Sequence, residues 1–118
     1  METIEKIKKD FEDYVIQQNL ALAEGNGKKA NRFHKKIQNL YRNVRDINRV
    51  DIFKDYLNDK NESVTLWAAG LCLKEYPEVA QKKLVELSKS SDSMICLSAK
   101  ATLEFYMKGM WDKLISFV

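Results

Sequence analysis

Apolar residues recur at helical spacing in the first part of the chain. Over residues 3–24 they fall in one arc when successive residues are placed about 100° apart, which predicts an amphipathic helix with Thr3 as its N-cap. The arc consists of Ile4, Ile7, Phe11, Tyr14, Val15 and Leu22. The sequence Gly25-Asn26-Gly27 follows, and these residues tolerate the left-handed backbone that ends a helix. Residues 1–47 are therefore predicted to form a helical hairpin.

The second helix of this hairpin, from about Lys28 to Ile47, has the clearest separation of apolar and polar sides. Its predicted buried arc comprises Ala30, Phe33, Ile37, Leu40, Tyr41, Val44 and Ile47. A stripe of basic residues is formed by Lys28, Arg32, Lys35, Arg42, Arg45 and Arg49. Residues 28–49 hold eight basic residues and one acid, a net charge of +7, whereas residues 1–27 carry −3 and residues 50–118 carry −1. The net positive charge therefore lies on one predicted helix.

Beyond Asn48 the pattern shortens into two similar units, residues 50–76 and 78–108. Each holds a short helix, a polar loop and a longer helix whose predicted N-cap is a serine, Ser63 or Ser93. An offset of 30 residues aligns these serines and also aligns Leu57 with Leu87, Glu62 with Asp92, Ala69 with Ala99, Leu73 with Leu103, and Tyr76 with Tyr106. Pro77 is predicted to end the first long helix at Tyr76. Such short hairpins cannot bury an apolar face alone, so they are predicted to stack on their neighbours.

The stretch from Ser63 to Leu73 is the longest uncharged run in the chain. It is shorter than the roughly 20 residues that span a bilayer, so it is predicted to be a buried helix. Ala68, Ala69 and Gly70 at its centre are predicted to let other helices approach closely. The tail, residues 109–118, is apolar enough to cap the open end of the stack.

The composition indicates one all-α domain over residues 1–118. With one proline and four glycines in 118 residues, the chain has too few turn residues for a β-rich domain, and we expect a HEAT-like α-α superhelix of about five to seven helices. The charged start METIEKIKKDFED lacks the apolar core of a signal peptide, so a cytoplasmic protein without membrane contact is expected. Cys72 and Cys96 show no CxxC spacing and are predicted to be buried free thiols.

Catalytic and metal-binding patterns are not evident in the sequence. The single histidine, His34, is interpreted as an ordinary surface or boundary residue. There is no glycine-rich phosphate loop, no H-E-x-x-H and no nucleophile elbow. We therefore expect no enzyme activity, no catalytic residue, no cofactor and no bound metal.

The candidate partner-binding residues are Arg32, Lys35, Arg42, Arg45, Arg49, Trp67 and Leu97. Three interpretations of the basic stripe remain open: a solvated face, a contact for an acidic protein, and a phosphate-binding site for nucleic acid. Nucleic acid is the second choice of partner because the net positive charge lies on one element only. Trp67 and Leu97, which the 30-residue offset aligns, form either a contact patch or packing against neighbouring helices.

One motif carries a resemblance to HEAT repeats. The pattern V-x-x-x-A-A-x-x-x-L, here Val64, Ala68, Ala69 and Leu73, resembles the second helix of HEAT-like repeats. The second copy has Met94, Ser98, Ala99 and Leu103 and resembles it less closely. The 30-residue period is shorter than the usual 40 or so, so the repeats are interpreted as truncated.

The segments LNDKNESVTLWAA and AKATLEFYMKGM, together with the Lys-rich second helix, resemble a family of small bacterial all-helical domains of unknown function. Such families resemble immunity proteins of bacterial polymorphic toxin systems. This resemblance implies a small protein that binds and blocks a cognate toxin. The alternatives are a nucleic-acid-binding HEAT-like protein that uses the basic second helix, and a structural subunit of a larger assembly.

Overall fold

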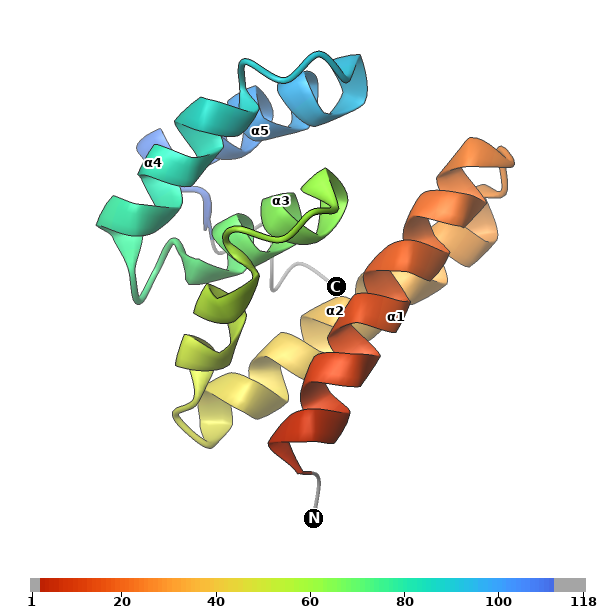
Figure 1. The fold of residues 1–118 in the computed structure, drawn as a ribbon, viewed down its shortest axis with the longest axis vertical. Helices are drawn as coiled ribbons and strands as arrows, with labels where there is room; N and C mark the ends of the chain where they lie inside the picture. The colour runs from red at the N-terminus through yellow and green to blue at the C-terminus, as the bar shows by residue number, and fades with distance from the viewer. Residues whose placement is uncertain (1–2, 112–118) are drawn as a thin grey trace. The chain divides into compact units, whose positions relative to one another are not determined.

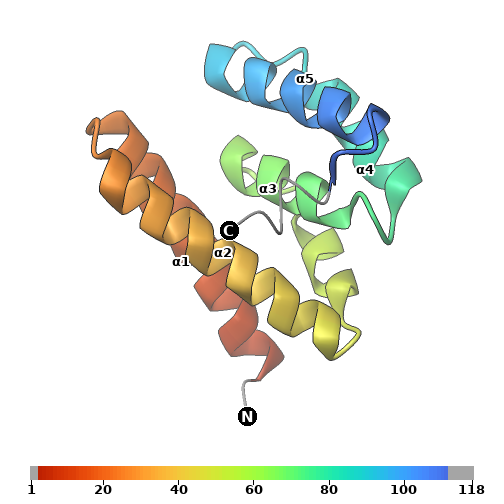
Figure 2. The same ribbon diagram turned by 180° about the vertical axis from the view of Figure 1, so that it is seen from behind.

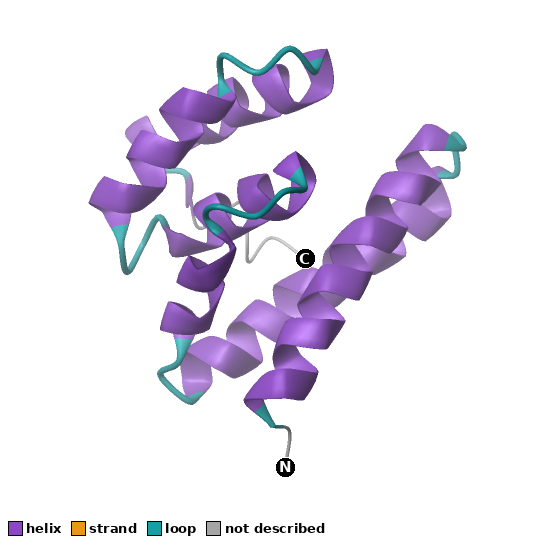
Figure 3. Cartoon of the chain, in the orientation of Figure 1, coloured by secondary structure: helices purple, strands orange, loops and turns teal. Residues whose placement is uncertain are grey.

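The computed structural model describes residues 3–111, and the chain is all-α over that range. Figures 1, 2 and 3 show the elements, which are α1 (Ile4–Ala23), α2 (Gly27–Asp46), the 3-10 helix η1 (Val50–Tyr56), α3 (Glu62–Cys72), α4 (Pro77–Leu87) and α5 (Ser93–Met107). The predicted fold class and number of helices are confirmed. The chain forms two compact units, residues 1–52 and residues 53–118. The assignment of all 118 residues to one domain stays a prediction.

The N-terminal unit, residues 1–52, is built on the hairpin of α1 and α2, which lie side by side in Figures 1 and 2. Thr3 caps α1 as predicted, because its Oγ1 accepts a hydrogen bond from the backbone N–H of Lys6 at 3.1 Å. Gly25 takes φ +72°, and Asn26 donates its N–H to the carbonyl oxygen of Ala21 at 2.8 Å. This is the left-handed helix end that glycine permits, and it turns the chain into α2.

The core of this hairpin follows the predicted arcs in its middle but not at its ends. The side chains of Phe11, Val15, Ile37, Tyr41 and Val44 are fully buried. Leu22 and Ile47, both predicted to be buried, are instead 53% and 56% exposed. Leu22 lies in the last turn of α1, and Ile47 follows the last residue of α2. At the end of a helix the next turn is missing, so fewer side chains are available to cover these positions.

The C-terminal unit, residues 53–118, is organised around α3, which packs against both α4 and α5. The side chains of Ala68, Ala69, Leu71 and Cys72 are fully buried, so the prediction of a core helix in this stretch is confirmed. Trp111 covers part of α3 as well, since its Nε1–H donates to the carbonyl oxygen of Gly70 at 2.8 Å. Residues 112–118 of the predicted capping tail lie outside the described range.

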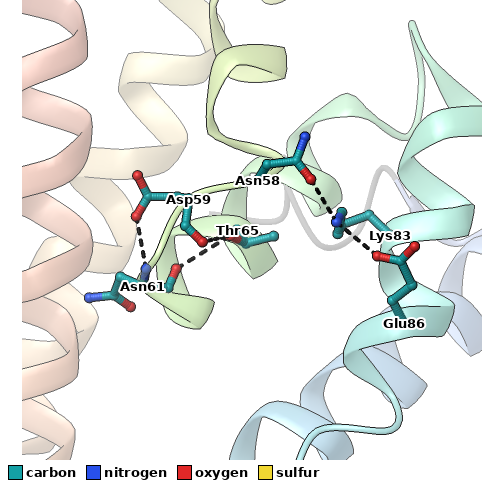
Figure 4. A network of polar contacts seen from close by, with 6 residues as sticks. All are labelled: Asn58, Asp59, Asn61, Thr65, Lys83 and Glu86. Carbon is teal, nitrogen blue, oxygen red and sulfur yellow. Dashed lines mark hydrogen bonds and ion pairs between the residues drawn. The ribbon is translucent and has the colours of Figure 1, made fainter.

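Polar contacts join the loop before α3 to α4 (Figure 4). Lys83 Nζ donates to Asn58 Oδ1 at 3.0 Å and forms an ion pair with Glu86 Oε2 at 2.8 Å. Thr65 Oγ1 donates to the carbonyl oxygen of Asp59 at 3.2 Å, which ties the same loop to the first turns of α3. These contacts fix the loop between two packed helices.

The predicted serine caps are wrong. Asn61 caps α3 by accepting the N–H of Ser63 at 2.9 Å, and Asp92 caps α5 by accepting the N–H groups of Met94 and Ile95 at 2.9 and 3.3 Å. Ser63 and Ser93 lie inside the first turn of each helix. Asparagine and aspartate are strong N-cap residues, and an oxygen located before the first turn can reach its free N–H groups.

The predicted end of α3 is also wrong. This helix ends at Cys72 rather than Tyr76, and Pro77 is the first residue of α4. Proline suits that position because its fixed φ matches a helix and its missing N–H would have no helical partner there. Tyr76 has φ −134° and ψ 61°, outside the α region, as expected for a residue that precedes proline.

Replacing Gly70 by alanine is expected to stabilise the protein. A Cβ atom at this position would lie 3.9 Å from Thr102 Cγ2, an ordinary van der Waals contact, and alanine removes the entropic cost of glycine inside a helix. We expect Gly70→Ala to raise the free energy of unfolding by about 0.5–1 kcal/mol in urea denaturation. A lower free energy of unfolding would mean that close packing requires glycine at this site.

The revised caps predict different effects for two adjacent residues. Asp92→Ala removes the acceptor for two backbone N–H groups and should lower the free energy of unfolding by about 1 kcal/mol. Ser93→Ala should change it by less than about 0.5 kcal/mol. Urea denaturation of the two variants provides the comparison, and a larger loss for Ser93→Ala would restore serine as the cap.

Candidate functional site

Four basic residues share one side of α2, and we call this set the α2 basic face: Lys28, Arg32, Lys35 and Arg42. At 100° per residue they span an arc of about 80°, on the side of α2 opposite the buried Ile37. Lys28, Arg32 and Lys35 are exposed, and Arg42 is half-buried. The arrangement places a line of cations along a regular helix that is held by the hairpin core.

The first three of these residues are not neutralised by acids in the described part of the chain. Lys28, Arg32 and Lys35 form no ion pair with any residue in the range 3–111. Arg42 Nη1 donates to the neutral Asn39 Oδ1 at 3.0 Å. The charges of Lys28, Arg32 and Lys35 are therefore directed to solvent.

Two other candidates, Arg45 and Arg49, are placed differently. The guanidinium of Arg45 lies 5.8 Å from the centre of the Tyr41 ring, and its Nε is 3.8 Å from Asp46 Oδ1. Arg49 Nε and Nη2 donate to the two carboxylate oxygens of Asp51 at 3.0 and 3.3 Å. The charge of Arg49 is thus compensated by a two-point ion pair.

The backbone explains why Arg49 does not continue the stripe. α2 ends at Asp46, and Asn48 takes φ +59°, the left-handed region. The N–H of Asn48 donates to the carbonyl oxygen of Arg45, and that of Arg49 donates to Val44, at 2.9 and 3.0 Å. This pair of bonds is the Schellman motif, which turns the chain away from the helix axis before Arg49. In the sequence, Asn48 was the signal for this helix end, because asparagine, like glycine, can adopt the left-handed conformation that ends a helix.

Trp67 and Leu97 belong to the C-terminal unit and differ in exposure. Trp67 on α3 is half-buried, whereas Leu97 on α5 is 63% exposed. Leu97 has apolar exposed neighbours on the same side of α5 that sequence reasoning did not select, namely Met94, Ala101 and Phe105. The signal available in the sequence was the low charge of this helix, in which Lys100 and Glu104 are the only charged residues, so most of its sides are apolar.

His34 occupies the boundary position that was expected of it. It is half-buried on α2, and its Nδ1 lies 3.4 Å from Gln18 Nε2 of α1. Burial lowers the pKa of His34 below its ordinary value of 6.5, because the charged imidazolium loses hydration there.

The two cysteines are free thiols in different surroundings. Cys72 is buried, and burial, reinforced by the negative charge of Glu75, raises its pKa to about 12. Cys96, also predicted to be buried, is only half-buried, and its Sγ–H donates to the carbonyl oxygen of Ser88 at 3.1 Å. At neutral pH Cys72 is protonated and therefore a poor nucleophile.

Clusters that would hold a metal ion are absent from residues 3–111, where no three His, Cys, Asp or Glu side chains converge. Over the same range no helix has both the length and the apolar character to cross a bilayer. Comparisons of the chain with protein-family models, curated proteins and solved structures give no match. The exposed surfaces described above are therefore the basis for proposing a function.

The lowered pKa of His34 predicts how stability varies with pH. Below pH 6.5 the unfolded chain takes up a proton at this residue, while the folded protein resists the same protonation until lower pH. The contribution of His34 to the free energy of unfolding is therefore constant above pH 6.5 and decreases as the pH falls from 6.5 to the pKa of His34 in the folded protein. We expect the melting temperature of the wild type to fall more than that of His34→Gln between pH 7.5 and 5.5. Parallel decreases in the two proteins would contradict this assignment.

Proposed function

We propose that this chain is a non-enzymatic protein-binding module and that its α2 basic face contacts an acidic surface of the partner. The observation that carries this proposal is the exposure of Lys28, Arg32 and Lys35 on one helix without ion pairs in the described chain. A partner with carboxylates at matching spacing would complete these pairs. Arginine adds two-point hydrogen bonding to carboxylates.

The geometry favours an extended contact rather than a single ionic anchor. With a rise of about 1.5 Å per residue, the α2 basic face extends for about 21 Å from Lys28 to Arg42. Charges arranged over this length accelerate association with an oppositely charged surface and fix the orientation of the partner. The hairpin core holds α2 in place, so little ordering of the backbone accompanies binding.

Within this class of function, an immunity protein that occludes a cognate bacterial toxin is the specific role we propose. Its support is the resemblance of LNDKNESVTLWAA and AKATLEFYMKGM to small bacterial HEAT-like domains. In that role binding is itself the activity, which suits a chain whose sequence has no evident catalytic pattern. The α2 basic face would then cover an acidic surface of the toxin.

Nucleic acid is the competing partner, because a line of cations also fits phosphates. The charge distribution favours protein instead. Residues 50–118 carry a net charge of −1, and residues 1–27 carry −3, so the excess of positive charge is confined to residues 28–49. Nucleic-acid-binding domains more often spread basic residues over several elements.

Charge reversal on α2 tests the proposed contact. The double variant Arg32→Glu, Lys35→Glu should weaken capture of the partner from nuclease-treated native lysate by at least about tenfold, the loss of roughly 1.4 kcal/mol of binding free energy. Quantitative mass spectrometry of the captured proteins measures the effect. Equal urea midpoints for variant and wild type would show that the fold is intact.

The matched control is Lys82→Glu, Lys89→Glu, which makes the same change in net charge at exposed positions of the C-terminal unit. The control should retain the partner. Equal losses in both double variants would indicate a non-specific charge effect and contradict the proposal. Binding to mixed-sequence DNA or RNA that weakens steeply with salt and is lost only in the α2 variant would assign this face to phosphates instead.

A further inference from the structure

One side of α5 exposes a row of apolar side chains, which we call the α5 outer face: Met94, Leu97, Ala101 and Phe105. These residues span an arc of about 80° at 100° per residue. Met94 is 64% exposed, Leu97 63% and Phe105 37%. Another side of the same helix contributes Ile95 and Ala99 to the core. α5 is therefore apolar on two sides, and one of them faces solvent.

We propose that the α5 outer face binds the same face of a second copy of this chain, with the two α5 helices antiparallel and a twofold axis at Ala101. Two members of the row are symmetric about that residue, whereas Met94 would lie opposite Lys108 of the second copy. Leu97 lies four residues before Ala101 and Phe105 four residues after it, so each leucine meets the phenylalanine of the other copy. A twofold interface brings the same surface together from both copies, which requires this kind of self-complementarity.

The small side chain at the centre suits such a crossing. Ala101 is exposed and presents only a methyl group, so two helices can approach closely at this point while larger side chains pack on either side. Ile16 and Leu20 of α1 and Val79 and Val85 of α4 are also exposed, but neither pair is evenly spaced about a small residue.

The charges beside the row are also complementary under the same symmetry. Lys100 lies one residue before the centre, and Glu104 lies three residues after it, on the same edge of α5. In the antiparallel pair, Lys100 of one copy and Glu104 of the second copy are offset by about 3 Å along the helix axis, within reach of an ion pair. Two such pairs form, one at each side of the axis. Lys100 has no ion pair with the described residues of its own chain. Glu104 Oε1 already accepts a hydrogen bond from Lys108 Nζ of the same chain at 2.9 Å, so Oε2 of Glu104 is the atom that Lys100 of the second copy would contact.

The size of the surface determines the strength of the contact. A stable dimer buries about 800 Å² on each partner, and one helix face offers less than that. The dimer is therefore weak and forms at high protein concentration. Sedimentation velocity over a concentration series up to about 1 mM should show the average mass rising from monomer towards dimer. A monomer throughout this range would overturn the proposal.

Substitutions distinguish the α5 outer face from other exposed apolar residues. Leu97→Glu should abolish the rise in mass, whereas Val85→Glu on α4, where the native side chain is 46% exposed, should leave it unchanged. Loss of association in both variants, or in neither, would contradict the assignment to α5. Circular dichroism of each variant verifies that the helices are retained.

A charge exchange tests the antiparallel arrangement. Lys100→Glu places a carboxylate beside Glu104 of the second copy at two positions and should weaken the dimer by at least about tenfold. The double variant Lys100→Glu, Glu104→Lys restores opposite charges across the axis and should associate more tightly than Lys100→Glu alone. Because Glu104→Lys also removes the ion pair with Lys108, circular dichroism of the double variant verifies that α5 is retained. Failure of the double variant to recover association would contradict this arrangement.

Cross-linking locates the twofold axis. In a Cys96→Ser background, Ala101→Cys places two thiols next to each other at the axis, so mild oxidation should join the copies. Met94→Cys places its thiols about 21 Å apart along antiparallel helices, so oxidation should not join them. Cross-linking at position 94, or its absence at position 101, on a non-reducing gel would contradict the proposal.

Discussion

The C-terminal unit depends on the covering of α3, a helix that has no polar side. After Glu62 it contains no charged residue, and its buried side chains point in several directions around the axis. An apolar helix of this kind is stable in water only when neighbouring elements cover it. α4, α5 and Trp111 all serve this need, and Trp111 also satisfies its own indole N–H by bonding to Gly70.

The features that the sequence predicts well are those that local chemistry decides. Thr3, Gly25 and the strongly amphipathic α2 each depend on a few neighbouring residues, and the structure agrees with the prediction at all three. The start of α3 is also a local matter, but there two candidate caps compete within three residues. Asn61 prevails over Ser63 because it lies before the first turn, where the free N–H groups are within reach.

Surface features were harder to predict, because periodicity does not distinguish a helix that is covered on every side from one with an apolar solvent side. Apart from the edge that holds Lys100 and Glu104, α5 is apolar on several sides, so identifying Met94 and Phe105 as exposed required the positions of α3 and α4. The basic stripe was overestimated for a related reason. An ideal helix extended to Arg49 includes it in the stripe, but the left-handed Asn48 ends the helix first and Asp51 pairs with the arginine.

The N-caps of α3 and α5 show that the position at which a helix begins can change without changing which residues are buried. Ala69 and Ala99 are both fully buried and are 30 residues apart, as are Leu57 and Leu87, but Asn61 and Asp92 are 31 residues apart. Glu62 is the first helical residue of α3, whereas its counterpart Asp92 is the cap that precedes α5. The spacing between equivalent buried residues is nevertheless 30 residues in each case. The point at which a helix begins is thus an independent variable of each unit. A sequence change that moves a cap lengthens or shortens a solvent-facing turn without rotating the buried face.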